Sequence, residues 1–168
     1  MTGLVVLDLE FTAWEGSQAR KWNGPNEHRE IVQIGAVRMS RDRSGERQFE
    51  TLVRPARNPR LSDYFIALTG IAQAELDRRG RPFPAAWADF LEFAGGLPVW
   101  AWGRDGEVVA ENLLLAGMPL AGMPAVHDQG PDFIDGHGNA VAASWPASCP
   151  ILRCACHSSR TAVREREP

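Results

Sequence analysis

The sequence predicts a mixed α/β sheet that begins with an antiparallel three-strand meander and carries helices on its faces. Three observations support this prediction. First, an apolar run over residues 4–12 is followed by segments rich in β-branched residues at 30–39 and 49–54, with polar or glycine-containing stretches between them. Second, helical patterns fill residues 62–94. Third, another strand and another helix follow, an order typical of α/β sheets.

The apolar run at 4–12 carries two carboxylates, Asp8 and Glu10. Val and Leu occupy both faces of this run, which predicts a strand buried on both sides of a sheet. Strand side chains alternate, so the two carboxylates point the same way. Burying both without a partner would cost several kcal/mol or shift their pKa values strongly, so we expect a cation between them, most economically a divalent metal. The alternative is a pair on an edge strand that faces solvent.

The helical segments have recognisable starts and stops. Ser62 is a candidate N-cap for a helix over 63–68, and Gly70 precedes a second helix that ends at 79. A third helix starts near Pro84 and ends at 94, and a short strand over 98–103 and a helix from Asp105 to 116 follow. The aromatic residues in the third helix and the next strand are expected in the core: Trp87, Phe90, Phe93, Trp100 and Trp102.

Composition indicates an ordinary soluble globular protein, since 44% of the 168 residues are hydrophobic and 23% are charged. We expect one domain over 1–128, a short strand at 125–128 included, and an irregular tail over 129–168. No leader-like or membrane-spanning stretch is visible, so a cytoplasmic location without a membrane partner is expected. A net charge of −3 argues against a broad basic surface, but a nucleic-acid enzyme can take its positive charge from bound metals. The oligomeric state is left open.

Four ordered segments, at 6–12, 30–37, 68–71 and 102–105, resemble the motifs of the DEDDh 3'-5' exonuclease superfamily. The closest likeness is to its Eri-1-like and sporulation-inhibitor-like branch, within the ribonuclease H-like fold. The likeness covers roughly residues 4–128 in collinear order, and four ordered motifs are more specific than any one of them.

The resemblance implies a chemistry. Asp8, Glu10 and Asp105 would hold two divalent ions, Mg or Mn, although Asp105 could instead be a helix N-cap. Phe11 and Thr12 would lie beside the terminal nucleotide. The implied reaction is two-metal hydrolysis of phosphodiester bonds from the 3' end of single-stranded RNA or DNA.

The superfamily also places a general-base histidine and a fourth carboxylate in a His-x-x-x-x-Asp arrangement on a late helix. His127 and Asp132 have this spacing, but Gly130 and Pro131 between them would break a helix, and the pair comes too soon after Asp105. His157 comes later, but Ala162 stands five residues on. We therefore expect the chain from near Gly130 to be a frameshifted or truncated version of the last helix. The alternative function is an inactive exonuclease-fold module that binds nucleic acid or a protein.

Overall fold

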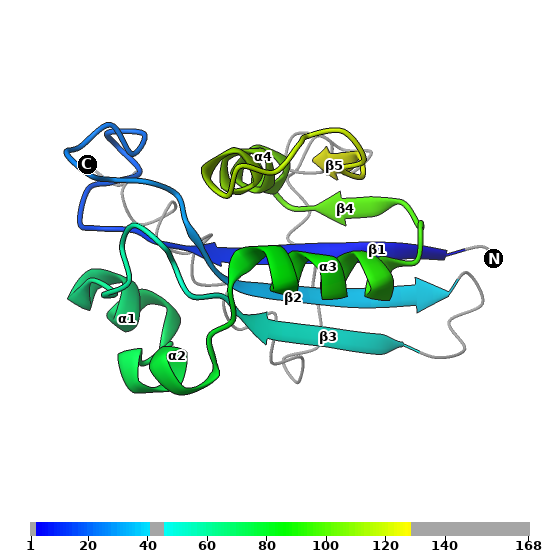
Figure 1. Cartoon of the computed structure of the whole chain (residues 1–168), viewed down its shortest axis with the longest axis horizontal. Helices are drawn as coiled ribbons and strands as arrows, with labels where there is room; N and C mark the ends of the chain where they lie inside the picture. The colour runs from blue at the N-terminus through cyan, green and yellow to red at the C-terminus, as the bar shows by residue number, and fades with distance from the viewer. Residues whose placement is uncertain (1–2, 41–45, 129–168) are drawn as a thin grey trace, which may run out of the picture.

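The computed structural model describes residues 3–40 and 46–128, which form a five-stranded sheet with the strand order β3-β2-β1-β4-β5 (Figure 1). The central strand β1 (Gly3–Phe11) pairs antiparallel with β2 (Ile31–Ser40), and β2 pairs antiparallel with β3 (Arg47–Leu52). On its other side β1 pairs in parallel with β4 (Val99–Ala101), which pairs in parallel with β5 (Val126–Asp128). The predicted mixed sheet with an antiparallel meander is confirmed.

Four helices accompany the sheet: α1 (Asp63–Thr69), α2 (Gln73–Arg79), α3 (Phe83–Ala94) and α4 (Asp105–Leu115). Figure 1 shows α3 lying across β1 and β2, α1 and α2 near the end of the sheet where β1 finishes, and α4 beside β4 and β5. The predicted N-cap of α1 is confirmed, because the Ser62 hydroxyl accepts a hydrogen bond from the Phe65 amide at 3.0 Å. Gly70, with φ of 77°, closes that helix.

The larger core cluster lies between one face of β1 and the helices α3 and α4. Val5, Leu7 and Leu9 are at most 5% exposed and pack with the buried sides of these two helices. On the opposite face of β1, Val6, Asp8 and Glu10 are only partly buried. The expectation that β1 is buried on both faces is therefore wrong for the described part of the chain, because α3 and α4 pack against the first face.

The predicted core aromatics divide into two groups. Trp87 and Phe90 are at most 2% exposed, as expected, and Phe93 is partly buried with its ring 5.3 Å from that of Phe49. Trp100 is partly buried, whereas Trp102 is 49% exposed, so its assignment to the core was wrong. Trp102 follows the last residue of β4, and by strand alternation it falls on the face of Trp100, opposite the face on which Val99 and Ala101 are buried.

A second cluster of buried residues supports the end of the sheet where β1 finishes. It joins α1 and α2 to β2 and β3, and its members are Ala13, Val32, Leu52, Leu61, Phe65, Ile71 and Leu76. None of the helices in the described ranges is long and apolar enough to cross a membrane. Residues 129–168, the expected tail, lie outside the described residues, so the division at 128 stays a prediction.

Candidate active site at the end of the central strand

The sheet topology brings three carboxylates to one end of the sheet, where the parallel strands β1 and β4 finish. Asp8 and Glu10 lie near the C-terminal end of β1, opposite Gly35 and Gln33 of β2. Strand β4 runs parallel to β1 in a register that pairs Leu7 with Ala101, so both strands end on the same side of the sheet. Asp105 follows shortly after β4, as the first residue of α4. Ligand sites of α/β sheets commonly lie at such an edge, beyond the carboxyl ends of parallel strands.

Asp8 and Glu10 repel each other. Burial of Asp8, together with the negative charge of Glu10, raises the pKa of the Asp8 carboxyl from 3.8 to about 7. Two carboxylates on one strand face, with the first withdrawn from water, are costly to ionise together. A cation held between them would lower that cost.

Asp105 is 8% exposed, which is unusual for a carboxylate. The N-cap residue of α4 is Arg104, whose side chain makes no capping hydrogen bond, and Asp105 is the first helical residue. The alternative assignment of Asp105 as N-cap is therefore wrong. A carboxylate in the first turn is still favoured by the positive end of the helix dipole, which helps to hold a negative charge at this buried position.

The donor chemistry of these residues fits a hard divalent cation, since carboxylate oxygens are the ligands that Mg²⁺ and Mn²⁺ prefer. Within residues 3–40 and 46–128, no group of three or more His, Cys, Asp or Glu side chains is arranged so that it could hold a metal ion. The structure thus brings Asp8 and Glu10 to one face and Asp105 to the same edge of the sheet, without a finished ligand cluster in that part of the chain.

Phe11 and Thr12 follow the carboxylates, after an irregularity in the β1–β2 pairing between Glu10 and Phe11. Phe11 is partly buried, and its ring lies 5.4 Å from that of Trp22. Thr12 is 3% exposed, and its hydroxyl donates to the carbonyl oxygen of His28 and accepts from the amide of Glu30 at 3.0 Å. The Thr12 hydroxyl therefore ties β1 to the segment before β2, and a contact of either residue with a nucleotide stays a prediction.

His127 lies on β5, two strands away from β1. It pairs with Trp100, which in turn pairs with Val6, and the rings of His127 and Trp100 stack 4.5 Å apart. Residues in register point to the same face, so His127 shares the face of Asp8 and Glu10 but is separated from them by β4. Its proposed carboxylate companion, Asp132, lies outside the described residues, and both roles stay predictions.

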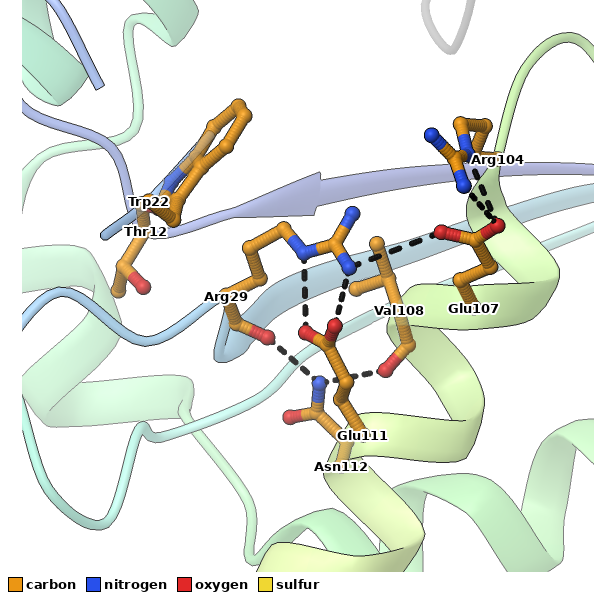
Figure 2. Close-up of polar contacts among 8 residues, drawn as sticks. All are labelled: Thr12, Trp22, Arg29, Arg104, Glu107, Val108, Glu111 and Asn112. Carbon is orange, nitrogen blue, oxygen red and sulfur yellow. Dashed lines mark hydrogen bonds and ion pairs between the residues drawn. The ribbon is translucent and has the colours of Figure 1, made fainter. Parts of the chain in front are cut away.

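Sequence reasoning missed a polar network that joins α4 to the segment before β2. Its main members are Arg29, Glu111 and Asn112 (Figure 2). One signal was available: Asn112 falls three residues after Val109 and one before Leu113, on the apolar stripe of the predicted helix. A polar residue on such a stripe is expected to find partners, and Asn112 is 5% exposed.

Comparison with known proteins identifies the class. A family model of exonucleases, that of RNase T, matches residues 5–113, which run from β1 to α4. The chain therefore belongs to this exonuclease family. The 3'-5' exonuclease Snipper of Drosophila melanogaster is 32% identical over 116 residues, which cover 68% of this chain and 36% of Snipper. ERI1 exoribonuclease 2 of Homo sapiens is 30% identical over 92 residues, which cover 54% of this chain and 12% of that protein.

Solved structures agree with this assignment. A 3'-exonuclease described in 3'-end specific recognition of a histone mRNA stem-loop is 25% identical with a TM-score of 0.58, over 68% of this chain and 52% of that one. The nuclease domain of 3'hExo, a DEDDh family member bound to rAMP, has a TM-score of 0.59 at 24% identity, over 71% and 62% of the two chains. The expected membership of the DEDDh superfamily and its Eri1-like branch is confirmed. The chain matches only about a tenth to a third of the length of its curated relatives.

Proposed function

We propose that this chain is a metal-dependent 3'-5' exonuclease that hydrolyses single-stranded RNA or DNA. One observation carries the proposal: Asp8 and Glu10 share a face at the end of the central strand, at the sheet edge that also bears the buried Asp105. These three oxygen donors lie within the region that matches the exonuclease family.

Asp8, Glu10 and Asp105 are the residues that would hold Mg²⁺ or Mn²⁺. When bound, two such ions supply an activated water and stabilise the leaving 3'-oxygen. The protein's own part is to present carboxylates whose mutual repulsion favours a cation and to keep them fixed at the strand end. His127 is proposed as the general base and Asp132 as the fourth carboxylate. His127 belongs to the proposed domain over 1–128, and Asp132 belongs to the proposed tail over 129–168.

The 3' end of a single strand is the proposed substrate. The related 3'-exonuclease is described in 3'-end recognition of a histone mRNA stem-loop, and E. coli exonuclease I in complex with an oligonucleotide. In this chain, Phe11 is the proposed stacking partner of the terminal base, and Thr12 is the proposed neighbour of the 3'-hydroxyl through its backbone. A cytoplasmic location belongs to the same proposal.

A second function is favoured by a specific observation. The part of the chain that the structure describes contains no group of three or more ligands arranged for a metal. A chain that keeps the exonuclease fold without a complete ligand set would bind nucleic acid or a protein partner without cleaving it.

Degradation of labelled oligonucleotides separates the two functions. Purified protein is incubated with 5'-labelled single-stranded RNA or DNA in Mn²⁺ or in EDTA, and the products are sized. The enzyme shortens the strand from its 3' end only with Mn²⁺, and Asp105→Asn reduces the rate by at least about 10²-fold because a ligand is lost. Asp89→Asn, on the exposed face of α3, is the matched control. Binding of the oligonucleotide without cleavage would support the inactive module instead.

A further inference from the structure

Arg29 lies between two parts of the candidate site that are far apart in the sequence. Figure 2 shows its guanidinium facing α4, with Trp22 on its other side. Arg29 is not in a helix or strand; it stands two residues before β2, and its side chain is 19% exposed. A half-buried arginine with several partners is expected to restrict the segments that it joins.

On the α4 side, Arg29 is held by side chain and backbone. Its Nε donates to Glu111 Oε2 at 2.9 Å and its Nη2 donates to Glu111 Oε1, so the two groups form a fork. The Arg29 carbonyl accepts from Asn112 Nδ2 at 2.7 Å, and Asn112 Oδ1 accepts from the Ile31 amide at 3.0 Å. The backbone around Arg29 is thereby fixed to the middle of α4.

A second carboxylate carries the contact toward the first turn of α4. Arg29 Nη2 lies 3.8 Å from Glu107 Oε2, while Glu107 Oε1 accepts from Arg104 Nε at 2.8 Å. Glu107 therefore lies between Arg29 and the residue that immediately precedes Asp105. Arg29 is thereby connected, through Glu107, to the helix turn that carries the third carboxylate.

On the other side, Arg29 reaches the residues that follow β1. Its guanidinium carbon lies 5.9 Å from the centroid of the Trp22 ring, a cation–π arrangement. Trp22 Nε1 donates to the carbonyl oxygen of Thr12 at 2.9 Å, and the Trp22 ring packs on Phe11. Arg29 thus contacts, through Trp22, the two residues proposed to lie beside the terminal nucleotide.

We propose that Arg29 is a positioning residue that couples occupation of the nucleotide site at Phe11 and Thr12 to the placement of Asp105. This inference rests on the proposed function and names a regulatory property of the same site. A nucleotide that orders Phe11 and Trp22 fixes Arg29, and Arg29 then fixes the first turns of α4 through Glu107 and Glu111. Metal binding at the carboxylates is tighter when the nucleotide site is filled, and the coupling acts in both directions.

Calorimetric titration with Mn²⁺, in the absence and presence of saturating adenosine, measures this coupling. Adenosine has a base and a 3'-hydroxyl but no phosphate that a metal could contact directly. In the wild-type protein, adenosine is expected to tighten Mn²⁺ binding about fivefold. In Arg29→Ala and in Glu111→Gln the factor falls below about twofold, and Arg29→Lys, which keeps the charge but loses the fork, is intermediate.

Arg81→Ala is the matched control, since it removes an arginine paired with Asp89 on an exposed helix face. It should keep the wild-type coupling. Hydrogen exchange provides a second readout that needs no metal: Arg29→Ala should speed amide exchange both at residues 12–14 and at 105–108, while Arg81→Ala leaves both unchanged.

The outcomes are distinguishable. Wild-type protein that binds no Mn²⁺ contradicts the proposed function and the inference with it. Wild-type protein that binds Mn²⁺ without any effect of adenosine, or Arg29 and Glu111 variants that melt earlier but keep the full coupling, overturn the inference and leave the proposed function standing. Faster exchange in only one of the two segments also overturns it.

Discussion

Glu30 makes two hydrogen bonds to Asn58: its Oε2 accepts from the Asn58 backbone N–H at 2.7 Å and from the side-chain Nδ2 at 3.1 Å. Its other oxygen accepts from the amides of Ala56 and Arg57, both at 2.8 Å. A carboxylate that is only 3% exposed is thus satisfied by four N–H donors. The contact fixes the loop after β3 against the start of β2, next to the segment that carries Arg29.

Replacement of Glu30 by Ala should lower the free energy of unfolding by about 3 kcal/mol, because several N–H groups would lose their acceptor away from water. Glu30→Gln should cost less, since its amide oxygen can still accept while its amide nitrogen faces donors. Urea unfolding measures both changes. Glu75→Ala, which removes an exposed pair with Arg79, should change stability by no more than about 0.5 kcal/mol. Equal effects of Glu30→Ala and Glu75→Ala would contradict this account.

The raised pKa of Asp8 predicts a pH dependence of stability. The pKa is 3.8 in a free side chain and about 7 in the fold, so between these values the folded protein binds more protons than the unfolded protein. Without metal, the contribution of Asp8 to the free energy of unfolding therefore falls as pH rises from about 4 to about 7. Asp8→Asn removes this contribution, so the stability of the variant relative to wild type should increase as the pH rises from about 4 to about 7. Thermal melts in EDTA measure it, and parallel pH profiles would contradict it.

Metal addition should reverse this trend at the same carboxyl. A proton on Asp8 competes with a cation, so Mn²⁺ should raise the melting temperature of wild-type protein more at pH 8 than at pH 6. Asp8→Asn should show a smaller rise at both pH values, and excess EDTA should abolish the rise in wild type. An equal Mn²⁺ effect at the two pH values would show that the ion binds elsewhere.

Phe11 offers a test of the nucleotide site. Phe11→Leu keeps an apolar side chain against the core but removes the aromatic face, and stacking on an aromatic side chain contributes about 1–3 kcal/mol per base. The affinity for a short single-stranded oligonucleotide should fall about tenfold or more in Phe11→Leu, as measured by fluorescence anisotropy. Phe93→Leu, which removes a ring of α3 that packs on Phe49 of β3 rather than on Trp22, should bind as wild type does. Equal binding by all three proteins would exclude stacking on Phe11.

The end of α1 depends on a backbone conformation. Gly70 has φ of 77°, and its amide donates to the Ile66 carbonyl at 2.8 Å. Nothing lies within 4 Å of a Cβ built at this position, so Gly70→Ala should lose about 1 kcal/mol from backbone strain alone. Gly70→Asn should lose less, because Asn tolerates the left-handed region. Chemical denaturation of the two variants measures the difference, and equal losses would contradict a backbone origin.

The sheet and the helices were predictable because their signals are local. The shared face of Asp8 and Glu10, the N-cap at Ser62 and the helical spacing of Trp87 and Phe90 each depend on neighbouring residues alone. The structure places them as predicted. Boundaries differ more where strands end against loops. The third strand was expected at 49–54 and is Arg47–Leu52, since Val53 instead forms an isolated bridge to Arg81.

The site was only partly predictable because its supports are distant in the sequence. The carboxylate pair follows from strand alternation, but two of the three partners of Asn112, Arg29 and Ile31, lie more than 80 residues away. Glu30 was assigned to the start of a strand, and its buried role depends on a loop that follows β3. The exposed position of Trp102 also depends on which face of the sheet α3 and α4 cover, which periodicity over a few residues does not determine.

The central position of β1 has a consequence for the order of folding. One edge of β1 is completed by β2, which follows it directly, whereas the other edge waits for β4, whose residues Val99–Ala101 come near the end of the described chain. Closing the second edge costs more chain entropy than closing the first. We therefore expect the meander to gain protection in pulsed hydrogen exchange before β4 and α4 do. The three carboxylates would then be assembled in one of the last steps, so an early, partly folded chain cannot yet bind metal at all three.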